Sequence, residues 1–300
     1  MPSLKSIRRR ITSVKSTQKI TRAMKMVAAA RLRRAQQRIT ELRPYAQKTA
    51  EVLRSVAAGV VVADDASTHP LLARRPVKTA LLLVLTSDRG LAGAFNSSIT
   101  RVAERKLREL REEGVTPVVA TLGRKGRDHL KRRGYEARYD FTGAPEGSAE
   151  HAGEIARALT KAFVDGEVDE VVVLFNEFKS AINQKPVMQT VLPIPVGDGE
   201  TATGDAGAVQ APAGGDHIFE PSREALLDRL LPMYVEVSIY RAMLDSSASE
   251  HGARMSAMDS ATNNAKKMIA SLTLDYNRAR QAAITKELME IIGGAEAIKE

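Results

Sequence analysis

The sequence contains no cysteine. A disulfide framework, a thiolate metal site and a cysteine nucleophile are therefore excluded. Tryptophan is also absent, and aromatic residues make up only 4% of the chain, whereas hydrophobic residues make up 43%. This hydrophobic content is enough to bury a core. The abundance of Ala, Leu, Arg, Lys and Glu favours long helices over a compact aromatic-rich core.

Long apolar runs are also lacking. No segment approaches the ~20 consecutive apolar residues that a membrane-spanning helix needs, and the N-terminus lacks the apolar core of a secretory signal. We therefore expect a chain that is soluble or peripheral to a membrane and carries no targeting segment. Acidic residues are scarce at the start, where residues 1–60 hold fifteen Lys or Arg against Glu41 and Glu51, a net charge of +13. Such a block either attracts a negatively charged partner or forms a solvated helix face.

Residues 3–57 show alternating steps of three and four between apolar or small residues. This spacing predicts one helix with a single narrow seam, about 80 Å long at 1.5 Å per residue. Pro44 is expected to bend it locally. Only Gln18 and Thr21 interrupt the seam. Its members are Leu4, Ile7, Ile11, Val14, Met24, Ala28, Leu32, Ala35, Ile39, Leu42, Ala46, Ala50 and Leu53.

A second and longer seam follows near the other end of the chain. We predict that its helix begins after the N-cap residue Ser222, is kinked at Pro232, and stops at Gly293 and Gly294. Two seams that are each too narrow to make a core predict an antiparallel coiled coil, from which residues 284–297 would project alone. The members of this seam are Leu227, Leu230, Tyr234, Val237, Leu244, Ala248, Met255, Met258, Ala265, Ile269, Leu272, Tyr276, Ala279 and Ala283.

Between the two helices the pattern is that of an α/β domain. Strand-like apolar runs at 79–86, 116–121 and 169–176 alternate with helical patterns near 92–113, 124–133 and 149–165. This alternation predicts a mostly parallel sheet with right-handed crossovers. The run at 187–194 is expected to add another strand. Because it contains Pro193, this strand should either lie at an edge of the sheet or have the proline at its end.

The predicted fold class is an α/β domain flanked by an antiparallel coiled coil of the N- and C-terminal helices. We assign residues 1–60 to the first helix, 61–221 to the α/β domain and 222–300 to the second helix. Residues 197–216 are a low-complexity run of Gly, Ala, Asp and Pro. We interpret that run as a mobile loop within the α/β domain.

The run TSDRGLAGAFN at 86–96 leaves the first predicted strand at the place where open α/β sheets bind phosphates. Gly90 and Gly93 do not complete G-x-G-x-x-G, and no P-loop motif occurs in the chain. A structural turn, in which Ser87 or Asp88 caps the following helix, is favoured over a nucleotide site. The nucleotide site stays open as the alternative.

No catalytic or metal-binding constellation stands out. The five histidines form no H-E-x-x-H motif, and no G-x-S-x-G turn is present. Glu287 and Glu290 lie on one helical face near a chain end. The basic N-terminal helix resembles a DNA-binding basic region, but its charges lie alongside the seam instead of preceding it. A coiled coil that faces a protein is therefore favoured, and nucleic acid remains the minority alternative.

Four runs give the chain a resemblance to the γ subunit family of F-type ATP synthases over nearly its whole length. They are TQKITRAMKMVAA, TSDRGLAGAFN, SEHGARM at 249–255 and ITKELMEIIGGAEA at 284–297. The last run fits the C-terminal signature of the family, with Glu287, Glu290 and the Gly294–Ala295 pair at its spacing. The resemblance implies that the α/β domain is Rossmann-like.

The resemblance also implies a function, which is that of a non-catalytic rotor. In this family the coiled coil stands inside a hexamer of α and β subunits, and the α/β domain lies with the ε subunit on the membrane c-ring. Proton flow turns the ring and the shaft, and the asymmetric shaft drives ATP synthesis at the β sites. No cofactor, nucleic acid or membrane span is implied.

The implied location is the cytoplasmic side of a bacterial inner membrane, as a peripheral part of the synthase. The loop 197–216 is extended relative to the family pattern. Because the chain has no cysteine, this loop cannot act as a dithiol regulatory switch like that of chloroplast forms. A bacterial type is therefore favoured.

Eight residues match family positions where γ couples to the β subunits or to its own opposite helix. They are Lys19, Met24, Arg254, Arg280, Gln281, Thr285, Glu287 and Glu290. Arg22 joins them because the basic helix is expected to face acidic loops of the β subunits. Plain seam packing is the alternative for Met24, and a solvated face is the alternative for Arg280 and Gln281.

Overall fold

The structure is a computed structural model that describes residues 3–58, 69–143, 147–181, 183–195 and 223–297. The chain divides into two compact units. The coiled-coil unit comprises Met1–Ala29 and Arg254–Glu300, and the α/β unit comprises Ala30–Ala253. The predicted boundaries at 60/61 and 221/222 and the loop 197–216 lie outside the described residues, so these segment limits remain predictions.

Two long helices lie at the ends of the chain, as predicted. Helix α1 spans Leu4–Ala58, and helix α5 spans Arg223–Ala297. The predicted stop at Gly293 and Gly294 is wrong, because α5 runs through both glycines. Glycine permits the left-handed conformation that ends a helix but does not require it. The predicted N-cap Ser222 lies outside the described residues.

The α/β unit is built on a five-stranded sheet of order β3-β2-β1-β4-β5. Its strands are β1 (Thr79–Leu85), β2 (Thr116–Leu122), β3 (Ala137–Asp140), β4 (Glu170–Phe178) and β5 (Gln184–Leu192). All neighbouring pairs are parallel except β4 and β5. The mostly parallel sheet is confirmed, and β5 forms an edge that ends just before Pro193. Strand β3 was not predicted, because its four residues contain no apolar run.

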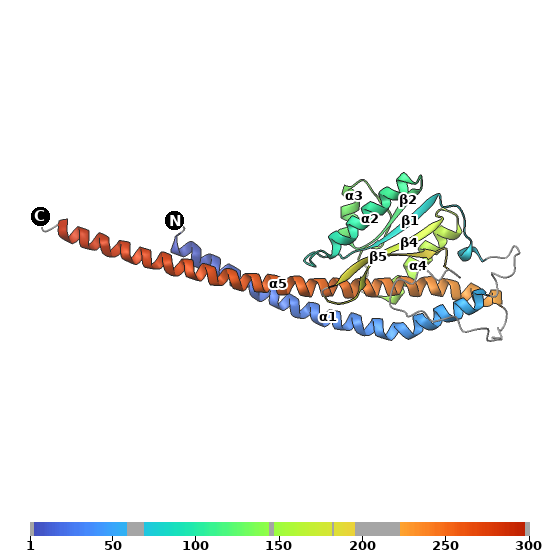
Figure 1. Ribbon diagram of the computed structural model, residues 1–300, viewed down its shortest axis with the longest axis horizontal. Helices are drawn as coiled ribbons and strands as arrows, with labels where there is room; N and C mark the ends of the chain where they lie inside the picture. The colour runs from blue at the N-terminus through green and yellow to red at the C-terminus, as the bar shows by residue number, and fades with distance from the viewer. Residues whose placement is uncertain (1–2, 59–68, 144–146, 182, 196–222, 298–300) are drawn as a thin grey trace. The chain divides into compact units, whose positions relative to one another are not determined.

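Helices cover both faces of this sheet (Figure 1). Helices α2 (Phe95–Glu112) and α3 (Arg124–Arg132) lie on one face, and α4 (Ala149–Val164) and α5 lie on the other. The short 3₁₀ helix η1 spans Pro70–Leu72. Alternate residues of β1 serve the two faces, since Leu82 packs with α2 and α3 while Leu81 packs with α4 and α5. This burial on both faces explains the continuous apolar run of β1.

Helix α5 is part of the core of the α/β unit. Its side chains join the buried cluster that also contains residues of the sheet and of α4. They are Leu231, Val235, Ile239 and Ala242. They form a second stripe beside the predicted seam, at steps of four and three. The predicted coiled coil did not include this second stripe, which the sheet covers.

Candidate functional site

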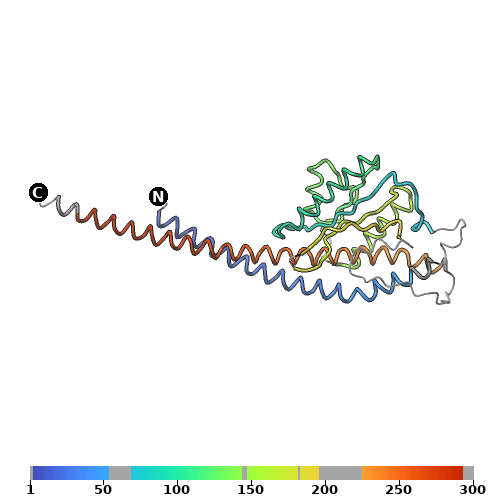
Figure 2. The backbone as a smooth tube through the Cα atoms, viewed as in Figure 1, coloured from blue at the N-terminus to red at the C-terminus, as the bar shows by residue number. Residues whose placement is uncertain are grey.

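The candidate site begins with the pairing of α1 and α5 in the coiled-coil unit (Figure 2). The hydroxyl oxygens of Thr21 and Thr262 lie 2.8 Å apart, and Lys25 Nζ lies 2.6 Å from Asp259 Oδ1. Residue numbers rise along α1 while those of their partners fall along α5. The two helices are therefore antiparallel, as the sequence predicts.

The seam between these helices is lined by small and apolar side chains. Ile7 and Ala28 are buried on α1, and Met258, Ala265 and Leu272 are buried on α5. Alanine at a contact position lets two helix backbones approach closely. This part of the seam confirms the predicted steps of three and four.

A threonine pair interrupts this apolar seam. The hydroxyl oxygens of Thr262 and Thr21 also lie 2.7 Å from Met258 O and 3.1 Å from Gln18 O, and either hydroxyl can donate the hydrogen bond that joins the pair. Thr21 is only 8% exposed. Thr21 is one of the two predicted interruptions of the seam, and its partner Thr262 was not predicted. The spacing could have identified this partner, because Thr262 lies four residues after Met258 and three before Ala265, and so occupies a seam position.

An ion pair lies one turn from the threonine pair. The side chains of Lys25 and Asp259 are 42% and 48% exposed, so solvent screens their attraction. Exposed pairs of this kind contribute about 0.2–1 kcal/mol to stability. The main effect of the two polar contacts is therefore to specify one register of the seam.

The predicted basic residues of α1 lie beside the seam. Lys19 and Arg22 are exposed and share one helical face with Lys15, at steps of four and three. Neither Lys19 nor Arg22 forms an ion pair with any residue that the structure describes. Met24 is half-buried, so seam packing accounts for part of its surface. These basic residues lie on α1 beside its seam with α5. In a DNA-binding basic region of the zipper type, the basic residues instead precede the seam.

The predicted residues of α5 fall into two groups. Arg254 is half-buried, whereas five further residues are exposed. These five are Arg280, Gln281, Thr285, Glu287 and Glu290. Glu290 pairs with Lys286 at 3.5 Å. The register of the ion pair sets Lys19 near residue 265, about 20 Å along α5 from Arg280. The predicted residues therefore form an extended surface and no single pocket.

The last described turns of α5 expose an apolar surface. Ile284, Leu288 and Ile291 follow one another at steps of four and three, and they are 55%, 55% and 72% exposed. Met289 and Ile292 are exposed beside them. We call these five residues the α5 end stripe. It is offset from the seam, whose spacing beyond Ala283 would fall on polar residues. Exposed apolar surfaces of this kind are typical of sites that contact another protein or a membrane.

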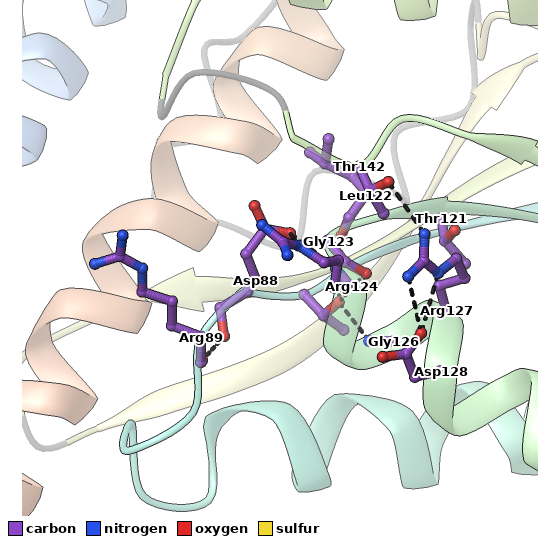
Figure 3. A network of polar contacts seen from close by, with 12 residues as sticks. Asp88, Arg89, Thr121, Leu122, Gly123, Arg124, Gly126, Arg127, Asp128 and Thr142 are labelled. Carbon is purple, nitrogen blue, oxygen red and sulfur yellow. Dashed lines mark hydrogen bonds and ion pairs between the residues drawn. The ribbon is translucent and has the colours of Figure 1, made fainter.

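The turn after β1 organises the start of α3 (Figure 3). Asp88 Oδ1 accepts a hydrogen bond from Arg124 N at 2.9 Å, and Thr86 Oγ1 accepts one from Gly126 N at 2.8 Å. The predicted capping of the following helix, α2, is therefore wrong for Asp88, whereas Ser87 Oγ lies 2.8 Å from Asn96 Nδ2 and so contacts a side chain in the first turn of α2. Asp88 caps α3 because β1 and β2 are parallel neighbours, and their ends bring the two following loops together.

The turn that contains Gly90 and Gly93 is shaped by its backbone conformation. A Cβ on Gly90 would meet nothing closer than Lys125 Cε at 3.9 Å. Gly93 has a φ of 56° and supports the bend, together with Leu91 at 65°. The close approach lies instead at Gly123, where a Cβ would lie 2.2 Å from Thr86 O. These features agree with a structural turn.

The SEHGARM run fixes α5 to the sheet within the α/β unit. Ser249 Oγ donates to Asn176 O at 2.9 Å, and His251 is buried. A Cβ on Gly252 would lie 3.2 Å from Ala181 Cα, which is tighter than ordinary contact. Glycine at position 252 therefore lets the helix lie close against the segment that follows β4.

No described helix is long and apolar enough to cross a membrane. No group of three or more His, Asp or Glu side chains among the described residues is arranged to hold a metal ion.

Solved structures share the combination of long terminal helices and an α/β domain. A chain in the central stalk and c-ring structure of the Tetrahymena thermophila mitochondrial ATP synthase matches with a TM-score of 0.59 and 26% identity, over 81% of this chain and 99% of that one. A chain of the Euglena gracilis mitochondrial ATP synthase has the same fold, with a TM-score of 0.65 and 18% identity over 98% and 94%. The fold is therefore that of ATP synthase central-stalk subunits.

The sequence comparisons give the family. The family model described as ATP synthase matches residues 3–298. The ATP synthase gamma chain of Anaeromyxobacter sp. (strain Fw109-5) is 54% identical over the full length of both chains, and that of Sorangium cellulosum (strain So ce56) is 50% identical, also over the full length of both. This chain belongs to the ATP synthase gamma chain family.

Proposed function

We propose that this chain is the rotating, non-catalytic shaft of a proton-translocating bacterial ATP synthase. In this role α1 and α5 turn inside a hexamer of α and β subunits and change the conformations of the β catalytic sites. Family membership supports the assignment to the synthase. The single observation that carries the role of a shaft is the α5 end stripe.

The α5 end stripe supports this role because it lies on an unpaired helix end. Its five large apolar side chains are exposed, and α1 does not cover them. Burial of such a side chain is worth about 1.5–3 kcal/mol, so a surrounding partner would stabilise the end considerably. A hexamer with a central opening supplies a sleeve that surrounds the helix on all sides.

The basic face of α1 suits acidic loops of the β subunits. Residues 1–29 contain eight Lys or Arg and no acidic residue. Lys19 and Arg22 are exposed and form no ion pair with a described residue, so their charges are available to a partner. Charges at the rim of an interface set its register and its rate of formation more than its affinity.

We assign contact roles to the other predicted residues on the same reasoning. Each is proposed to touch a β subunit or the opposite helix of the shaft. They are Met24, Arg254, Arg280, Gln281, Thr285, Glu287 and Glu290. The α/β unit is proposed to meet the ε subunit and the c-ring, on the cytoplasmic side of the inner membrane.

Reconstitution with α and β subunits tests the proposal. We expect one copy of the full chain to assemble with three αβ pairs into a complex that hydrolyses ATP, and deletion of residues 284–300 to weaken that complex. A matched variant, Leu274→Ala, removes an exposed apolar side chain of α5 outside the stripe and should leave assembly unchanged. If the full chain neither assembles with the α and β subunits nor affects ATP hydrolysis, the proposed role as a shaft is refuted.

A further inference from the structure

A basic groove lies between α2 and α3 in the α/β unit. It has a volume of about 360 Å³. Its walls are the first turns of α2 and side chains from both helices. The charged or titratable residues that line this α2–α3 groove are Arg101, Glu104, Lys125, His129, Arg132 and Arg133.

The charge of the groove is strongly unbalanced. Four Lys or Arg against Glu104 give the lining a net charge of +3, with His129 counted as neutral. Glu104 is already engaged, because it contacts His129 and lies 3.4 Å from Arg133 Nε. The side chains of Arg101 and Lys125 have no hydrogen-bond or ion-pair partner among the residues described, although the backbone N–H of Lys125 donates to Ser87 O. Like charges that converge in this way repel one another, and a bound anion relieves the repulsion.

The backbone adds to this positive field. The first turn of α2 lines the groove, and the N-cap residue Ala94 supplies no side-chain acceptor. The positive end of the helix dipole favours an anion there. The start of α3 differs, because Asp88 and Thr86 already accept its N–H groups.

We propose that the α2–α3 groove binds a multiply charged phosphate group. Arg101 and Lys125 make the principal contacts, and the remaining cations and the first turn of α2 surround them. Arginine matches the oxygen geometry of phosphate with paired hydrogen bonds, and lysine adds a point charge. The volume lies at the small end of the range for ligand sites, which suits a polyphosphate better than a large ligand. This inference does not depend on the role as a shaft.

Calorimetric titration of the full chain with inorganic tripolyphosphate tests the proposal. We expect saturable binding to one site, weakened about tenfold or more in the variant Arg101→Ala/Lys125→Ala, because two charge-assisted contacts are lost. The matched variant Arg108→Ala removes an exposed cation of α2 that does not line the groove. It should change the affinity less than about threefold. If both variants weakened tripolyphosphate binding equally, the proposed site would be overturned, because the result would indicate nonspecific electrostatic attraction to the basic surface.

A second arm identifies the source of the phosphate. Vesicles of phosphatidylcholine with and without phosphatidic acid are sedimented with the same three proteins. Binding to phosphatidic acid that is lost in the double variant, without tripolyphosphate binding, assigns the groove to a lipid headgroup. Tripolyphosphate binding alone assigns it to a soluble phosphate compound. Absence of both overturns the proposal, and thermal melts followed by circular dichroism verify that each variant is folded.

Discussion

A buried carboxylic acid in α5 gives the sharpest prediction about stability. Asp245 lies in the α/β unit, and its side chain is only 11% exposed. Burial raises the pKa of Asp245 to about 6 from its ordinary value of 3.8. Arg241, with Nε 3.9 Å away, and Arg43 lower the pKa, while the nearby charge of Glu177 raises it further. Burial outweighs these charges, so the fold favours the protonated acid.

The magnitude follows from linkage between protonation and folding. The pKa shift is about two units, and each unit corresponds to ~1.36 kcal/mol, so the cost of charging Asp245 in the fold is about 3 kcal/mol. Below pH 4 both states hold the proton and no cost arises. Between pH 4 and pH 6 the folded state keeps the proton that the unfolded state has lost. Stability therefore falls as the pH rises through this window, and the full cost is present above it.

Asp245→Asn removes this cost. At pH 7.5 we expect its free energy of unfolding to exceed that of the native sequence by up to about 3 kcal/mol, and at pH 4 the two should be nearly equal. Urea unfolding followed by far-ultraviolet circular dichroism at intervals across this range measures the difference. The control Asp275→Asn removes an exposed carboxylate of the same helix. Parallel pH profiles of the native and Asp245→Asn proteins would refute the reasoning.

Three further predictions concern packing, coupling and capping. Gly252→Ala should lower the free energy of unfolding by about 1 kcal/mol, because overpacking outweighs the gain in helix propensity, whereas Gly153→Ala meets only the flexible end of a glutamate and should not. Lys19→Glu/Arg22→Glu should impair proton pumping in vesicles while ATP hydrolysis stays largely intact; unchanged pumping would count against a coupling role. Thr86→Val should cost about 1–3 kcal/mol, measured by urea unfolding, because the N–H of the third residue of α3 loses its acceptor, and Thr86→Ser should restore most of it.

The main elements of the fold could be predicted because their patterns are local. The steps of three and four identified α1 and α5, and continuous apolar runs identified β1, β2 and β4. Strand β3 escaped because ARYD has no apolar run and is held by pairing with β2. The second buried stripe of α5, with Leu231 and Val235, also escaped. The sequence does not say which element covers a stripe, and the sheet covers this one.

The candidate site could be predicted less completely, because its parts depend on contacts between distant segments. The resemblance supplied Lys19 and Glu290, which are exposed on their helices. The bond between Thr21 and Thr262 joins residues 241 positions apart and required the register of the two helices. Asp88 was assigned to the wrong helix because its partner follows β2, which is distant along the chain.

The two polar contacts in the seam have a mechanical consequence. If α1 slid along α5 by one helical turn, about 5.4 Å, the hydroxyls of Thr21 and Thr262 would separate. Lys25 and Asp259 would lose their contact in the same movement, since the ion pair lies one turn away. Apolar seam positions tolerate such slippage far better, because one alanine contact resembles the next. The threonine pair and the ion pair thus oppose sliding of α1 along α5 when force acts along the helix axes.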